Sequence, residues 1–113
     1  MQNRKLQLVA YIATPTEKID ARVLSDQLAL IQAYCDEYGH SITEVFGDVR
    51  KGDLRAFYDA GRRGMAFDGL IAANRRVFRS AYKLEGQIAL FQERGKRLII
   101  VAEELRFGPQ IHY

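Results

Sequence analysis

The sequence contains one cysteine, two histidines, two prolines and no long apolar run. The single thiol, Cys35, excludes an internal disulfide and fits a reducing cytosol. His40 and His112 have no Cys or His partner at metal-ligand spacing, so we expect neither a metal site nor a cofactor. The longest apolar stretches, LIIVA and LIAA, are far shorter than the ~20 residues that span a bilayer. We therefore expect a cytoplasmic protein with no membrane partner.

The composition is that of one globular domain. The chain has 113 residues, of which 48% are hydrophobic and 27% charged, and a chain of this length can bury roughly two thirds of its unfolded surface. No internal repeat or linker interrupts it, so we expect residues 1–113 to form a single domain. The net charge of +3 and pI near 9.2 permit a polyanionic partner without requiring one.

Strand and helix signals alternate along the chain. Strands are expected at LQLVAYIA (6–13), SITEVFGDV (41–49), FDGLIAA (67–73) and KRLIIVAEEL (96–105), with an irregular tail at 106–113. Apolar residues at helical spacing predict helices between these strands, with stripes beginning at Leu24, Leu54 and Val77 and glycines at their ends. Strands separated by helices predict an α/β fold: a mainly parallel sheet of about four strands with helices on both faces.

The segment YIATPTE (11–17) carries a helix-start pattern. Thr14 suits the N-cap position, Pro15 has no N–H and suits the first helical position, and Glu17 follows Thr14 by three residues as in a capping box. We therefore expect the first helix to begin here.

In a parallel sheet, ligands bind beyond the carboxyl ends of the strands. The segments at those ends are 13–16, 48–52 and 73–79. The last of them contains NRRVFRS, which predicts a helix capped by Asn74 with Arg75, Arg76 and Arg79 in its first turns. Cations are disfavoured at a helix N-terminus unless an anion binds there, so this cluster predicts a phosphate or nucleic-acid contact. The alternative is that the arginines pair with carboxylates, namely Glu85, Glu103 or Glu104.

The order of these segments resembles the catalytic domain of serine recombinases of the resolvase/invertase type. Members open with a strand ending Tyr-x-Arg-Val-Ser, and this chain has YIATP. A Gln-containing helix ending near Tyr-Cys and Gly follows, here SDQLALIQAYCDEYG. Later come a strand ending Phe-x-Asp-x-x-Ser-Gly, a strand leading into Asp-Arg-Leu-x-Arg-Ser and a final Gly-x-x-Leu strand. Their counterparts here are VFGDVRKG, RRVFRS and GKRLIIVAEEL.

The resemblance implies a resolvase-like fold and a link to DNA recombination. Members of the family normally continue into a separate DNA-reading domain, and we expect residues 1–113 to contain none. In the family, a serine hydroxyl attacks a phosphodiester while arginines stabilise the charge that builds on phosphorus. Matching residues retained here are Gln27, Asp48, Arg76 and Arg79. The positions that depart from the family are Ala13 for the strand-end Arg, Pro15 for the nucleophilic Ser, Lys51 for the Ser before the Gly, and Arg75 for the Asp before the arginines.

Because Pro15 offers no hydroxyl, we expect the chain to lack strand cleavage and to retain an arginine-lined phosphate pocket at Arg75, Arg76 and Arg79. Two alternatives stay open. One is an active recombinase that uses Thr14 or Thr16. The other is a non-catalytic module that contacts a protein partner, either another copy of the chain or an intact recombinase.

Overall fold

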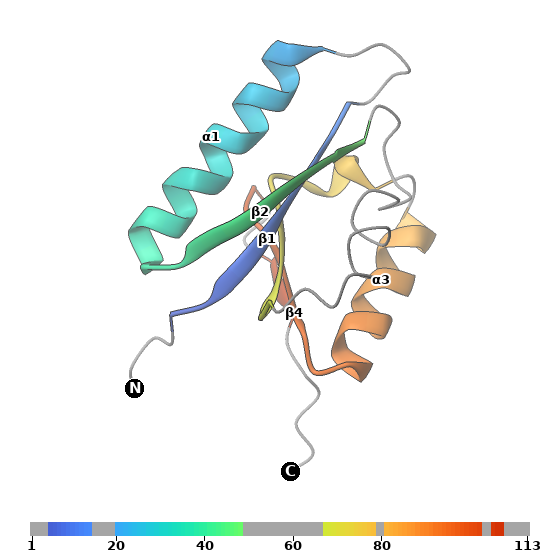
Figure 1. Cartoon of the computed structure of the whole chain (residues 1–113). Helices are drawn as coiled ribbons and strands as arrows, with labels where there is room; N and C mark the ends of the chain where they lie inside the picture. The colour runs from blue at the N-terminus through green and yellow to red at the C-terminus, as the bar shows by residue number, and fades with distance from the viewer. Residues whose placement is uncertain (1–4, 15–19, 49–66, 79–80, 103–104, 108–113) are drawn as a thin grey trace.

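A computed structural model of the chain describes residues 5–14, 20–48, 67–78, 81–102 and 105–107 (Figure 1). The elements within them are β1 (Gln7–Ala13), α1 (Ala21–Tyr38), β2 (Ser41–Asp48), β3 (Gly69–Ala72), the 3₁₀ turn η1 (Arg75–Val77), α3 (Ala81–Glu93), β4 (Arg97–Ile100) and β5 (Leu105–Phe107). The helix expected from the stripe at Leu54 lies outside the described residues.

The strands form one sheet in the order β2-β1-β3-β4-β5. The first four strands are parallel, and β5 runs antiparallel to β4. This arrangement confirms the predicted α/β fold with a mainly parallel sheet. Strand β2, which follows β1 in the chain, lies on one side of β1, and β3 lies on the other side. Strand β4 lies beyond β3, so β1 and β3 are neighbours in the middle of the sheet.

The described helices α1 and α3 cover opposite faces of the sheet (Figure 1). Ile31 and Cys35 of α1 pack against one face of β1, which presents Leu8 and Ala10 there. On the other face, Val9, Tyr11 and Ala13 of β1 share a cluster with Leu84 and Phe91 of α3. Both faces of β1 are therefore buried, which explains its nearly continuous apolar sequence and confirms the prediction of helices on both faces.

A β-bulge in β2 explains why Ile42 and Val45, three residues apart, lie on the same face of the sheet. Leu8 pairs with Ile42 and Val9 pairs with Glu44, so Thr43 is an extra residue in the ladder. The extra residue shifts the alternation by one, and Val45 then lies beside Ala10 on the α1 face. The Thr43 hydroxyl donates to the Leu8 carbonyl oxygen over 3.3 Å.

The first helix begins later than the capping pattern predicted. The N-cap of α1 is Asp20, whose side chain accepts from the backbone N–H groups of Arg22 and Val23, and not Thr14. Asp20 immediately precedes the first helical residue, Ala21, and aspartate is among the preferred N-cap residues. The predicted end is confirmed, since Gly39 takes the left-handed conformation with φ 75° that glycine tolerates best.

The expected continuous helix from Asn74 to Gly95 is wrong in its first part. Asn74 does act as an N-cap, but only for η1, and Phe78 then leaves helical geometry with φ −90° and ψ 146°. The Phe78 side chain is 2% exposed and packs with its ring centroid 6.2 Å from that of Tyr11. Burial of Phe78 beneath β1 thus accompanies the interruption of the helix, and α3 begins at Ala81.

The expected fourth strand is also divided. β4 ends at Ile100, a turn follows at residues 101–102, and β5 returns so that Leu98 pairs with Phe107 and Ile100 with Leu105. The prediction of an irregular tail was therefore wrong for residues 106 and 107. A continuous β-rich segment does not by itself reveal a reversal of direction, which is why the hairpin was missed. No α-helix within the described part of the chain has the length and hydropathy needed to cross a membrane.

Candidate functional site

The sheet has its topological switch point between β1 and β3. The connections from these two strands depart on opposite faces, through α1 and α3, and a crevice for ligands is expected beyond the carboxyl ends at such a point. Thr14 directly follows β1, while Ala73 and Asn74 follow β3. In Figure 1 the carboxyl ends of β1 and β2 and the first turn of α1 all lie in the upper part of the view. We refer to this region as the crevice end.

Gln27 of α1 is held at the crevice end by the backbone of β1. Its side chain is 8% exposed, its Oε1 accepts from the Ala13 N–H at 3.0 Å, and its Nε2 donates to the Ala13 carbonyl oxygen at 2.8 Å. The amide therefore pairs both backbone groups of one residue, as a neighbouring strand would. Each such buried hydrogen bond contributes about 0.5–1.5 kcal/mol net, and more is lost if a buried partner stays unsatisfied.

Ala13 occupies the position where the resemblance expects an arginine. Its side chain is 1% exposed and belongs to the apolar cluster between the sheet and α3, together with Val77 and Phe78. Its backbone lies opposite Asp48 in the parallel ladder, so the structure places the carboxyl-terminal residues of β1 and β2 side by side. No cationic side chain extends from position 13, and none would fit there without entering the apolar cluster.

Thr14 is fully buried, with 0% exposure. A nucleophilic hydroxyl has to reach a phosphorus atom of the substrate within about 3–3.5 Å, and an inaccessible hydroxyl cannot approach a DNA backbone without a rearrangement of the chain. The structure therefore gives the Thr14 alternative no support. Pro15 and Thr16 lie outside the described residues.

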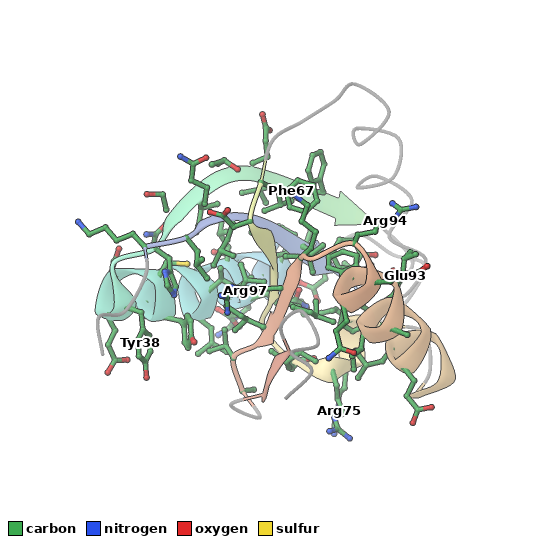
Figure 2. All side chains as sticks on the ribbon, turned by 90° about the horizontal axis from the view of Figure 1, so that it is seen from below. Tyr38, Phe67, Arg75, Glu93, Arg94 and Arg97 are labelled. Atoms are coloured by element: carbon green, nitrogen blue, oxygen red, sulfur yellow. The ribbon has the colours of Figure 1, made fainter. Side chains whose placement is uncertain are left out.

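Two of the three arginines predicted to line a phosphate pocket lie in the described part of the chain. Arg75 and Arg76 lie in η1 and are exposed, and Figure 2 shows Arg75 extending outward from the ribbon. The Asn74 side chain accepts from the Arg76 N–H at 2.9 Å, which fixes the first residues of the turn. Arg79 lies outside the described residues.

This placement corrects the electrostatic argument made from the sequence. Arg75 and Arg76 precede α3 by six and five positions and belong to a separate three-residue turn. A macrodipole develops only over an extended helix and acts within its terminal turn. The anion preference of a long helix therefore does not act on Arg75 and Arg76, and any phosphate contact there would depend on their own guanidinium groups.

Asp68, His40 and Cys35 have structural surroundings in the described part of the chain. Asp68 accepts from the Gln7 N–H at 2.7 Å and His40 Nδ1 accepts from the Leu6 N–H at 3.1 Å, so both stabilise the start of β1. Burial, with a smaller contribution from Asp36, raises the pKa of the Cys35 thiol to about 11, which keeps the thiol protonated and unreactive at neutral pH. Among the described residues, no three His, Cys, Asp or Glu side chains gather as metal ligands.

Two solved structures are similar to this fold. The N-terminal catalytic domain of TP901-1 integrase matches with a TM-score of 0.66 and 15% identity, covering 88% of this chain and 80% of that one. The C-terminal catalytic domain of ISC1926 TnpA, an IS607-like serine recombinase, matches with a TM-score of 0.68 and 18% identity, covering 84% and 69%. No protein-family model and no curated protein matches the sequence. The chain thus has the fold of serine recombinase catalytic domains, as the sequence motifs indicated.

The sequence identified Gln27 but not what it does. The resemblance assigned it to the active site, whereas the structure shows its amide bound to the Ala13 backbone. The sequence did contain a signal for this role. Gln27 is a polar residue among Leu24, Leu28 and Ile31, on the side of the helix that packs against the sheet. Buried glutamines are uncommon and are hydrogen-bonded when they occur. The sequence could therefore predict that Gln27 has a hydrogen-bond partner, but not that this partner is the Ala13 backbone.

Proposed function

We propose that this chain is a serine-recombinase-like domain that takes part in DNA recombination by binding DNA phosphates without cutting the strand. The observation that carries the proposal is the combination of a recombinase catalytic-domain fold with a carboxyl end of β1 at which Ala13 and Thr14 are both buried. The fold supports DNA as the partner. The lack of an accessible hydroxyl at Thr14, and of a guanidinium at position 13, supports the absence of cleavage.

The DNA-binding groups in this proposal are the exposed guanidiniums of η1. Arg75 and Arg76 lie directly after β3, one of the two strands at the switch point. Arginine donates two parallel hydrogen bonds to a phosphate and keeps its charge at any physiological pH. Arg79 is included from its place in the sequence alone. A DNA partner and a single buried thiol are consistent with work in the cytoplasm, which stays a prediction.

The proposal is tested by measuring DNA affinity as a function of salt. Neutralising a phosphate releases counterions, and each lost contact reduces the slope of log affinity against log salt by about 0.9 on duplex DNA. The double variant Arg75→Ala/Arg76→Ala should therefore weaken binding to duplexes of unrelated sequence equally and reduce the slope by about 1.8. Fluorescence anisotropy of a labelled duplex, titrated at several salt concentrations, measures both quantities.

A matched control separates specific contacts from net charge. Lys5→Ala/Arg94→Ala also removes two exposed cations, and both positions lie at the end of the sheet opposite the crevice end, before β1 and after α3. This variant should retain most of the wild-type slope. An equal loss in both double variants would show that only overall charge matters, and no DNA affinity in the wild type would favour the protein-interaction alternative.

The absence of cleavage has its own test. A suicide substrate, in which a nick near the site lets the cut fragment diffuse away, traps any covalent protein–DNA link. We expect no adduct with the wild-type chain. An adduct that persists in Thr14→Ala and disappears in Thr16→Ala would identify an active recombinase and overturn the proposal.

A further inference from the structure

The buried polar side chain of α1, Gln27, points to a connection between that helix and the crevice end. Ile31 and Cys35, the other buried residues of α1, are apolar and contact the sheet through the apolar cluster. Gln27 instead makes two hydrogen bonds to Ala13, 14 positions away in the sequence. Both bonds are buried, and together they use the amide oxygen as an acceptor and one amide N–H as a donor.

The Ala13 backbone needs a hydrogen-bonding partner because the pairing of β1 with β3 ends before this residue. The last residue of β1 that pairs with β3 is Tyr11, opposite Ala72, and Ala13 lies two residues beyond it. A buried backbone N–H and carbonyl must find partners, and the Gln27 amide supplies one acceptor and one donor at the right spacing. It joins α1 to the end of β1 at Ala13, a residue that also lies opposite Asp48 of β2.

We propose that Gln27 is a positioning residue: its amide fixes the exit of β1 at the crevice end and couples α1 to that exit. A displacement of α1 along its axis would carry the amide away from Ala13 and release the peptide that precedes Thr14. Because its two buried hydrogen bonds join the amide to the Ala13 backbone, the role proposed for Gln27 is exerted through the backbone and not by contact with a phosphate.

The first experiment follows the Ala13 backbone directly. Amide hydrogen exchange measured by NMR should show at least a tenfold loss of protection at Ala13 in Gln27→Met, a variant of similar size that has no amide. Val9 and Leu98, in the centre of the sheet, should keep their protection and so report an intact fold. Gln32→Met, at an exposed position of the same helix, serves as control and should leave Ala13 unchanged. Unchanged exchange at Ala13 in Gln27→Met would overturn the proposal.

The second experiment remains informative if Gln27→Met does not fold. Gln27→Glu has nearly the same shape, and in its protonated form the carboxyl can accept from the Ala13 N–H and donate to the Ala13 carbonyl oxygen. The ionised form can only accept. The melting temperature of this variant should therefore approach that of the wild type near about pH 4 and fall well below it at neutral pH, since an unperturbed glutamate titrates at about 4.3. An identical deficit at both pH values would indicate a packing role alone.

A third experiment rests on the proposed DNA binding, and its result is interpreted separately from the first two. A labelled DNA duplex should bind Gln27→Met several-fold more weakly than Gln32→Met at a temperature where both are folded. If the wild type binds no DNA, the proposed function fails while the exchange and pH experiments still decide the positioning role. If DNA binds equally to both variants while Ala13 exchange differs, the coupling reaches the backbone but not the bound phosphates, and the positioning role is confined to the fold.

Discussion

Restoring the arginine that the family resemblance expects at position 13 should destabilise the protein. The Ala13 side chain is 1% exposed and lies among Val77 and Phe78 in the cluster beneath α3. An arginine there would place a guanidinium in an apolar, closely packed region. Leaving a buried charge unpaired costs roughly 3–5 kcal/mol, and the added volume costs about 1–3 kcal/mol more. A domain of this size has about 5–15 kcal/mol in total, so Ala13→Arg should be marginally folded at best.

The assay is urea unfolding followed by circular dichroism. With a slope of about 1.5 kcal/mol per molar urea, a loss of 3 kcal/mol shifts the midpoint down by about 2 M. Ala89→Arg makes the same chemical change at an exposed position of α3 and should stay within about 0.5 kcal/mol of the wild type. Equal midpoints for the two variants would refute the reasoning. So would a covalent DNA adduct formed by Ala13→Arg/Pro15→Ser, because the arginine would then have to reach the crevice end.

Two further predictions concern the core. A Cβ at Gly69 would lie 2.5 Å from the Arg97 carbonyl oxygen, so Gly69→Ala should lower the free energy of unfolding in urea by about 1–3 kcal/mol. A Cβ at Gly86 in α3 would meet nothing within 4 Å, so Gly86→Ala should raise the same free energy by about 0.5–1 kcal/mol. Burial raises the pKa of Cys35 from 9.0 to about 11, so its contribution is full below pH 9 and lost as pH rises through 11; unfolding at pH 8 and 10.5 should therefore show a larger loss for the wild type than for Cys35→Ala, by up to roughly 3 kcal/mol, and equal losses would contradict this.

The sheet and its covering helices were predictable because their signals are local and repeated. Buried parallel strands read as short apolar runs, as in β3 and β4, and the stripe from Leu24 to Tyr38 marked α1 over most of its length. Gly39 marked its end because few other residues adopt a positive φ without strain. Parallel pairing followed from the alternation of strands and helices.

The errors arose where tertiary packing decided between acceptable local structures. Thr14 and Asp20 are both good N-cap residues, and only the burial of Thr14 at the end of β1 distinguishes them. Phe78 fits a helical stripe by spacing, yet its contact with Tyr11 accompanies an extended backbone. The reversal between β4 and β5 likewise has no marker in a continuous β-rich segment.

The candidate site was predictable in place but not in detail. The carboxyl ends of β1 and β3 follow from topology, and exposed arginines after β3 could be read from the sequence. The bond between Gln27 and Ala13 could not, because no periodic pattern connects a helix side chain to a single peptide of a strand. Position 13 was identified as an altered residue, while its burial in the α3-side cluster required coordinates.

The extra residue at Thr43 has a consequence for how copies of this domain behave when crowded. Strand β2 is the last strand on its side of the described sheet, and unpaired outer strands readily recruit the backbones of other molecules. The bulge breaks the regular spacing of its hydrogen-bonding groups, and the exposed Glu44 beside it adds a charge that two aligned copies would bring together. Copies of the domain at high concentration should therefore be less prone to pair at this strand and merge into a continuous β-assembly.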